Sequence, residues 1–204
     1  MKNGQLNKIY ISLTLIVFFC FASGTGLAQD LTDATFFQFG SGLYMPATDG
    51  WDEVYDSDII PITLGYTKFY TDVLGLELAV GYYAQTGETV EGEGFEPESV
   101  DFLMVPLTIT GIARLTLGVT TPYAGFGLGG AYFSEAASGW DNTGYTYLAL
   151  AKGGANLSLT EKWLVFAEIH YSYIPVEGDE KSLSGEDVDF GGLGAILGVR
   201  YRTR

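Results

Sequence analysis

A strict alternation of side-chain character marks the segment Trp163 to Tyr173, Trp-Leu-Val-Phe-Ala-Glu-Ile-His-Tyr-Ser-Tyr. Successive side chains of a β-strand point to opposite faces, so one face of this segment carries only apolar and aromatic residues. Trp163 and Tyr171 on that face are separated by roughly 26 Å along the strand, or about 20 Å of height at a tilt near 40°. That height approximates the apolar band of an outer-membrane barrel. The pattern therefore predicts one strand of a transmembrane β-barrel.

The same alternation recurs in the segments 74–86, 99–116, 143–160 and 187–202. Each of them has one apolar face, and the charged residues in the middle of these segments all fall on the opposite face. The inward side should therefore carry Glu77, Arg114, Lys152 and Arg200, together with Glu168 and His170 of the first segment described. A charge in the middle of a lipid-facing surface costs a few kcal/mol, so this segregation favours apolar side chains outside and charges inside.

The whole chain divides into eight strand-like runs, which gives an all-β, eight-stranded, antiparallel up-and-down transmembrane β-barrel. We expect strands at 35–45, 58–70, 74–86, 99–116, 121–134, 143–160, 163–174 and 187–202. The connectors alternate in length. Those at 46–57, 87–98, 135–142 and 175–186 are long, and those at 71–73, 117–120 and 161–162 are short. Long surface loops that alternate with tight periplasmic turns are typical of outer-membrane barrels.

Some positions predict local departures from a regular barrel. Pro61 and Pro106 each lack a backbone donor, so we expect a bulge or a strand end at both. Lys68 falls on the outward side of its strand and must extend to the membrane interface. The glycines at 125, 127 and 129 share the inward face, which would leave room for larger neighbours such as Phe166 or Tyr83.

A soluble alternative is a secreted β-sandwich or a lipocalin-like barrel with its apolar face inside. Eight strands alone are compatible with it. However, an inward face that carries all the mid-strand charges of four strands would make a poor core for a soluble protein, because buried charges are costly unless they are paired. The segregation of the charges favours the membrane barrel.

Composition agrees with closely packed strands rather than helices. Glycine accounts for 28 of 204 residues and aromatic residues for 15%, and glycine costs about 1 kcal/mol in a helix interior. The formal net charge of −15 disfavours nucleic-acid binding. The long connectors hold 15 of the 25 acidic residues. We expect solvated, mutually repelling loops there, and divalent-cation binding is the alternative, although no stretch has the spacing of a calcium loop.

The N-terminus predicts an export signal over residues 1–28, followed by a barrel domain over 29–204. Lys2 and Lys8 form its basic region, an apolar run extends from Ile9 to Ala22, and Gly26-Leu27-Ala28 is a small-x-small cleavage site. A permanent anchor or lipidation at Cys20 are the alternatives. Cleavage after Ala28 would leave a mature chain with no cysteine and a formal charge of −17.

Three segments resemble the small outer-membrane β-barrels of the OmpA, OmpX, OmpW and opacity type, the "porin family". They are Pro122 to Phe133, Phe166 to Tyr173 and Leu197 to Arg202. The resemblance implies a bacterial outer-membrane location, outer-membrane lipids and lipopolysaccharide as surroundings, and insertion by the barrel-assembly machinery. Family members commonly end on an aromatic residue that this machinery reads, whereas Thr203 and Arg204 follow Tyr201-Arg202 here.

Two groups of candidate site residues follow from the alternation. Charges inside a narrow barrel must be paired or hydrated, so we expect a lumen ion-pair network of Glu77, Arg114, Lys152, Glu168, His170 and Arg200, with Glu77 and Arg114 at similar height. Aromatic residues at the lipid interface should be Tyr82, Tyr147, Trp163, Tyr171, Tyr173 and Tyr201. No cofactor or metal is expected.

An enzymatic alternative rests on His170-Tyr171-Ser172. Barrel lipid A deacylases of the PagL type carry a His-x-Ser-Asn motif, and Tyr173 occupies the asparagine position here. Those enzymes need the histidine and serine on the lipid side, which would also expose Glu168 to lipid. We therefore expect a monomeric structural or surface-interaction barrel that is not an enzyme, with a narrow channel for small solutes as the second hypothesis.

Overall fold

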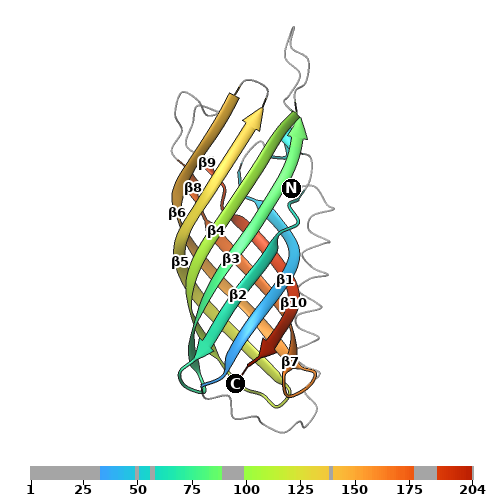
Figure 1. Ribbon diagram of the computed structural model, residues 1–204, viewed down its shortest axis with the longest axis vertical. Coiled ribbons are helices and arrows are strands. Elements are labelled where there is room, and N and C mark those ends of the chain that lie inside the picture. Colours follow the sequence, from blue (N-terminus) through green and yellow to red (C-terminus); the bar gives the residue numbers. More distant parts are fainter. Residues whose placement is uncertain are drawn as a thin grey trace.

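The computed structural model describes residues 33–48, 51–55, 58–88, 99–137, 140–176 and 188–203. Within them, eight strands close into an antiparallel barrel in the order β1-β10-β7-β6-β5-β4-β3-β2 (Figure 1). The strands of the barrel are β1 (Thr35–Pro46), β2 (Ile62–Phe69), β3 (Leu74–Glu88), β4 (Ser99–Arg114), β5 (Thr120–Ala137), β6 (Trp140–Ser158), β7 (Trp163–Tyr173) and β10 (Gly192–Arg202). The predicted eight-stranded up-and-down barrel is confirmed.

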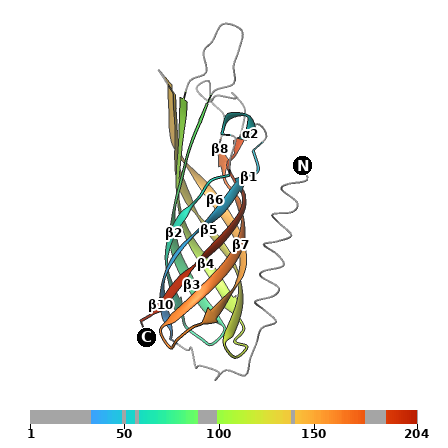
Figure 2. The ribbon, with the colours of Figure 1, turned by 90° about the vertical axis from the view of Figure 1, so that its right-hand side faces the viewer.

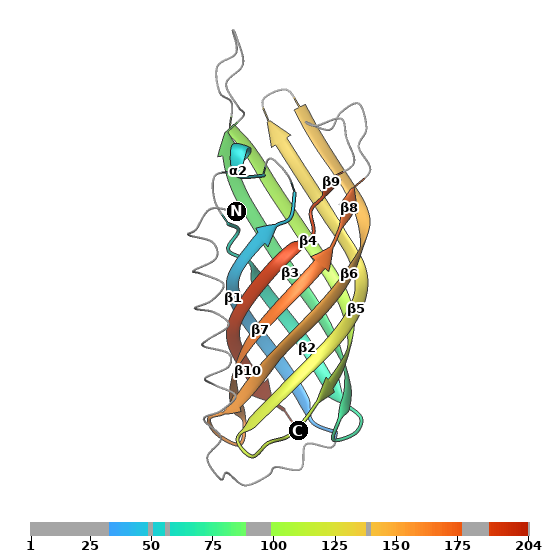
Figure 3. The same ribbon diagram turned by 180° about the vertical axis from the view of Figure 1, so that it is seen from behind.

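Closure joins the two ends of the described chain. β1 pairs with β2 on one side and with β10 on the other, where Phe36 lies opposite Arg202 and Pro46 opposite Gly192. The turns at 70–73, 115–119 and 159–162 lie together at one end of the barrel, which we call the short-turn end. The other end, where the chain leaves β1 and β7, is called the long-loop end. There β3 to β6 rise above β1 and β10 (Figure 3).

Side chains segregate as the alternation predicts. Along β7, the inward residues Leu164, Phe166, Glu168, His170 and Ser172 are all buried. The outward face of the barrel is apolar and exposed, with Phe126, Leu128 and Leu197 each above 60%. Soluble monomers rarely expose such contiguous apolar surface, so the soluble alternative does not fit this fold.

A small structured region covers the long-loop end (Figure 2). It comprises the four-residue helix α2 (Trp51–Val54) and a two-stranded sheet of β8 (Pro175–Val176) and β9 (Val188–Asp189). Asp189 fixes this sheet on the barrel, because its carboxylate accepts hydrogen bonds from the backbone N–H groups of Ile174 and Gly191, both at 2.8 Å. Among the described residues, no helix has the length and apolar character needed to cross a membrane.

Three details differ from the sequence expectation. The predicted long connector 135–142 is wrong, because β5 and β6 continue their ladder to the pair Ala137 and Trp140. The predicted strand 187–202 is divided at Phe190 and Gly191 into β9 and β10. Pro106 causes neither a strand end nor a register shift: the ladder between β3 and β4 keeps its register on both sides of it.

The missing donor at Pro106 affects the ladder locally. The pairs that would involve Gly81 and Tyr82 are absent between β3 and β4, while β4 pairs continuously with β5 through Pro106. Pro61 directly precedes β2, so the strand end predicted there is confirmed. The predicted export signal at 1–28 lies outside the described residues.

Candidate functional site

Four charged side chains from four strands meet inside the barrel. Glu77 of β3, Lys152 of β6, Glu168 of β7 and Arg200 of β10 form what we call the charged layer. Lys152 Nζ contacts Glu77 Oε1 and lies 3.0 Å from Glu168 Oε2. Arg200 Nη2 lies 3.6 Å from Glu77 Oε2 and 4.0 Å from Glu168 Oε2. Each cation is thus shared by both carboxylates, and the formal charges cancel.

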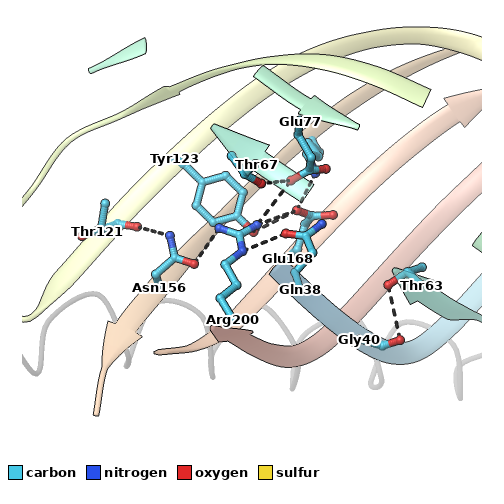
Figure 4. Close-up of polar contacts among 11 residues, drawn as sticks. Gln38, Gly40, Thr63, Thr67, Glu77, Thr121, Tyr123, Asn156, Glu168 and Arg200 are labelled. Atoms are coloured by element: carbon cyan, nitrogen blue, oxygen red, sulfur yellow. Dashed lines mark hydrogen bonds and ion pairs between the residues drawn. The ribbon is translucent and has the colours of Figure 1, made fainter. Parts of the chain in front are cut away.

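Neutral side chains satisfy the remaining polar atoms of the layer (Figure 4). The carboxylate of Glu77 accepts a hydrogen bond from Thr67 Oγ1 at 3.1 Å, and that of Glu168 accepts one from Tyr123 Oη at 2.8 Å. Arg200 donates to Gln38 Oε1 at 2.9 Å and to Asn156 Oδ1 at 2.7 Å. A buried ion pair is tolerated only when its other donors and acceptors are also paired, and this layer meets that condition.

Arg200 is also enclosed by aromatic rings. Its guanidinium carbon lies 4.6 Å from the centre of the Tyr123 ring and 4.7 Å from that of Phe166. The space for Phe166 comes from Gly40 and Gly198, because a methyl group on either would collide with that ring. The glycines of β5, which were predicted to leave room for Phe166, instead face Thr110 and the backbone of β4. Tyr83 is accommodated by Gly81.

Arg114 lies apart from the charged layer. The register places Glu77 opposite Thr110, four residues along β4 from Arg114, so the prediction that Glu77 and Arg114 lie at similar height is wrong. Arg114 is instead buried at the short-turn end. Its Nε donates to the backbone oxygen of Asp72 at 2.9 Å, and its guanidinium lies 3.4 Å from the centre of the Phe69 ring.

His170 adjoins the charged layer on its long-loop side. The register places it opposite Lys152, and its ring stacks on Tyr44 with 6.0 Å between ring centres. Gly194 provides the surface on which the imidazole lies, since an added methyl group there would meet the ring. Tyr44 in turn hydrogen-bonds Ser172 Oγ at 2.9 Å. His170 and Ser172 therefore face the interior of the barrel and belong to its packing.

A large aromatic cluster fills the lumen at the long-loop end. We call it the mouth cluster; its buried members are Tyr44, Trp51, Tyr55, Ile59, Tyr83, Val100, Phe102, Met104, Ala131, Phe133, Leu148, Ile174 and Phe190. Trp51 and Tyr55 stack with 4.1 Å between ring centres, and both pack against Phe102. The connector after β1 thereby folds into the mouth of the barrel and closes it with side chains.

A hydrogen bond between Tyr55 and Glu135 of β5 fixes the connector in the mouth. Tyr55 Oη donates to Glu135 Oε1 at 2.6 Å, and both side chains are buried. Gly87 of β3 leaves room for this arrangement, because a methyl group there would strike the Val54 backbone and the Tyr55 ring. Two effects raise the pKa of Tyr55 well above its ordinary value of 10.0: burial, which is the larger, and the hydrogen bond to Glu135.

A second apolar cluster closes the short-turn end. It comprises Ala34, Phe36, Phe69, Ile112, Tyr123 and Leu164. Between the charged layer and the mouth cluster lies a cavity of about 60 Å³, lined on one side by Lys152 and Glu168 and on the other by Tyr44 and Tyr83. This volume holds a few water molecules at most. The mouth cluster, the charged layer and this second cluster thus all lie inside the barrel.

Sequence reasoning missed several residues of the site. Gln38, Thr67, Tyr123 and Asn156 hold the charged layer, and each lies on the inward face of its strand. Asn156 could have been found from its place four residues after Lys152 on the same face. Trp51 and Tyr55 carry no periodic signal, because their helix is only four residues long.

All six predicted interface aromatics lie on the outer surface. Tyr82, Tyr147, Trp163, Tyr171 and Tyr173 are between 45% and 65% exposed, and Tyr201 is partly exposed beside Trp163. Trp163 and Tyr201 lie near the short-turn end, whereas Tyr147 and Tyr173 lie toward the long-loop end. Within the described ranges, no three His, Cys, Asp or Glu side chains form a group that could hold a metal ion.

Comparison with solved structures finds the same barrel in several bacterial proteins. The outer membrane protein OprG from Pseudomonas aeruginosa superimposes with a TM-score of 0.63 at 16% identity, covering 85% of this chain and 97% of OprG. The N-terminal β-barrel domain of OprF from the same organism gives 0.55 at 18% identity, with 84% and 98% covered. The chain has the fold of a small outer-membrane β-barrel.

Neisserial surface protein A shares this fold as well, with a TM-score of 0.55 at 14% identity and coverage of 82% of this chain and 95% of that protein. Comparisons with protein-family models and with curated proteins found no match. The likeness of this chain to its structural neighbours therefore concerns the backbone fold. The charged layer and the mouth cluster are described from its own residues.

Proposed function

We propose that the chain is a bacterial outer-membrane barrel with a structural and surface-interaction role and a closed lumen. The observation that carries this proposal is that buried side chains occupy the barrel interior at three levels, which supports a closed lumen. The mouth cluster, the charged layer and the second apolar cluster, at the short-turn end, succeed one another along the barrel axis. A solute would have to displace buried, paired charges to pass.

The short connectors supply the orientation. Outer-membrane barrels have short periplasmic turns and longer extracellular loops, so the long-loop end faces outward and the short-turn end faces the periplasm. Glu88, Asp101 and Asp141 then lie at the outer rim of the tall wall of β3 to β6, and Glu88 and Asp141 are two of the 15 acidic residues counted for the long connectors. The name of neisserial surface protein A describes a protein of the cell surface. Export by residues 1–28, assembly by the barrel machinery and a monomeric state within lipid and lipopolysaccharide complete the proposal.

The placement of His170 and Ser172 argues against a lipid-modifying enzyme. Both side chains are buried inside the barrel, 6% and 5% exposed, and Ser172 is hydrogen-bonded to Tyr44. A lipid substrate outside the barrel could not reach them across the strand. This geometry supports a structural barrel over the deacylase alternative.

Single-channel conductance tests the closed lumen. Mature chain 29–204, refolded into a planar bilayer, should give no discrete current steps, and its folded state is checked by gel mobility before and after boiling. Glu77→Ala removes the carboxylate shared by Lys152 and Arg200. We therefore expect this variant to show either discrete current steps or an increased current without resolved steps. Glu88→Ala, at the exposed end of β3, is the control and should stay silent. Discrete steps in the unmodified protein would instead establish the narrow channel.

A further inference from the structure

One half of the outer surface at the short-turn end is aromatic. Tyr66 of β2, Phe37 of β1, Tyr201 of β10 and Trp163 of β7 lie opposite one another in register across four neighbouring strands. The rings of Phe37 and Tyr66 are 5.3 Å apart, and those of Trp163 and Tyr201 are 4.9 Å apart. We call this row the aromatic ledge.

The other half of the same end is mostly aliphatic. Its exposed residues include Leu74 and Leu76 on β3, Leu115 and Leu117 after β4, and Leu159 after β6, with the ring of Phe126 on β5 in the register row of Leu76. A uniform belt around the barrel would anchor it equally on all sides. The aromatic ledge therefore distinguishes one side of the barrel from the other.

The outward-facing lysines of the described strands and turns lie on the aromatic side. Lys68 is two residues beyond Tyr66 toward the short-turn end, and Lys162 directly precedes Trp163. The Nζ of Lys68 lies 5.2 Å from the centre of the exposed Tyr70 ring. Arg114, Lys152 and Arg200 are buried inside, so they cannot contribute to this surface. Each lysine has an acidic residue in the adjacent turn, Asp72 for Lys68 and Glu161 for Lys162, and Lys68 is distinguished by its contact with Tyr70.

We propose that Lys68 and the aromatic ledge bind an anionic phospholipid headgroup of the phosphatidylglycerol class. This inference rests on the proposed function, in which the short-turn end faces the periplasmic leaflet. Aromatic rings partition to the level between headgroups and acyl chains, and an ammonium just beyond them meets the phosphate. The contact with Tyr70 holds the Lys68 side chain along the surface. The charge of Lys68 supplies the preference for anionic over zwitterionic lipid.

Native mass spectrometry of the refolded chain 29–204 tests the proposal with two probes, phosphatidylglycerol and phosphatidylcholine of identical acyl chains. The unmodified protein should retain phosphatidylglycerol about fivefold better, the effect of about one lysine near an anionic surface. Lys68→Gln should bring the ratio close to one, whereas Lys68→Arg should preserve it. Phe37→Leu should weaken retention of both lipids, and Phe126→Leu, the same change at an exposed site on β5, should not.

The outcomes separate the two proposals. Equal retention of both lipids by the unmodified protein, or an unchanged preference in Lys68→Gln, overturns the headgroup site while leaving the barrel function intact. A chain that shows no heat-dependent gel shift and does not enter vesicles of either lipid overturns the membrane function, and the lipid site with it. If Phe37→Leu and Phe126→Leu behave alike, the aromatic ledge has no part in binding.

Discussion

At the scale of single residues, the charged layer is stabilised because each cation interacts with both carboxylates, so that it does not consist of two separate ion pairs. Lys152 contacts both Glu77 and Glu168, and Arg200 lies within 4.0 Å of the same two carboxylates. Removing one member leaves a formal charge inside the barrel with no bulk water to solvate it. Loss of one partner of a buried pair costs about 3–5 kcal/mol, whereas an exposed pair contributes about 0–1 kcal/mol.

The substitution Lys152→Met keeps much of the side-chain volume and removes the charge. The two carboxylates are then balanced by Arg200 alone, so we expect the free energy of unfolding to fall by about 3–5 kcal/mol. Urea unfolding of the refolded barrel, followed by tryptophan fluorescence, measures the change. Lys162→Met, the same substitution in an exposed turn, is the control and should change stability by less than about 1 kcal/mol. Equal effects would mean that the buried charge of Lys152 is not required for stability.

Alternation along the strands predicted which side chains face inward, including all four members of the charged layer. It could not predict partners, because these depend on the register between strands that are distant in sequence. Arg114 illustrates the limit. It faces inward as predicted, yet the register places it at the short-turn end against Phe69, four residues from the position opposite Glu77. Gln38 and Thr67 are uncharged, so nothing in the sequence alone associated them with the layer.

At the scale of elements, the connector after β1 is the part that sequence patterns described least. Its helix is only four residues long, too short for any hydrophobic periodicity. Its position depends instead on tertiary contacts: Trp51 stacks on Tyr55, and Tyr55 donates a hydrogen bond to Glu135. The eight strands were predictable because alternation repeats over eight or more residues in each. The pairing of β5 with β6 beyond the apolar band was not, because polar residues such as Glu135 and Asn142 resemble a loop.

The variant Tyr55→Phe tests the attachment of this connector. At pH 8 it leaves the buried Glu135 carboxylate without its donor, so we expect a loss of about 1–3 kcal/mol in stability. The raised pKa of folded Tyr55 makes this advantage pH-dependent. It is fully present below the unfolded tyrosine pKa of about 10 and is lost as the pH rises above it, since only the unfolded chain then ionises.

Unfolding free energies of the unmodified protein and of Tyr55→Phe, measured at pH 8, 10 and 12, should therefore converge with increasing pH. The buried tyrosines that both proteins share cancel in the difference. Tyr145→Phe removes a hydroxyl from a side chain that is 86% exposed, and its difference from the unmodified protein should stay small at every pH. A constant difference for Tyr55→Phe would show that the Tyr55 hydroxyl ionises equally in both states.

At the scale of the whole molecule, the barrel depends on joining its first and last strands. β10 forms 11 residue pairs with β1 and 10 with β7, so each of its edges completes the wall. In lipid, every unpaired backbone group costs several kcal/mol, because no water replaces the lost hydrogen bond. In the proposed outer membrane, an open intermediate is therefore strongly destabilised relative to the closed barrel. The charged layer and the aromatic clusters fill the interior of the barrel, whereas the pairing of β10 with β1 and β7 is required for the barrel to form.

Truncation tests this dependence on closure directly. A chain of residues 29–191 lacks β10 and exposes the edges of both β1 and β7, so we expect no heat-dependent gel shift in lipid vesicles and aggregation through the open edges. A chain of residues 29–202 is the matched control. It loses the hydrogen bond from Thr203 N to the Thr35 oxygen but keeps every pair of β10, and it should fold as the longer chain does. A folded, vesicle-protected product from 29–191 would contradict the argument, because β1 and β7 would then have to pair without β10 between them.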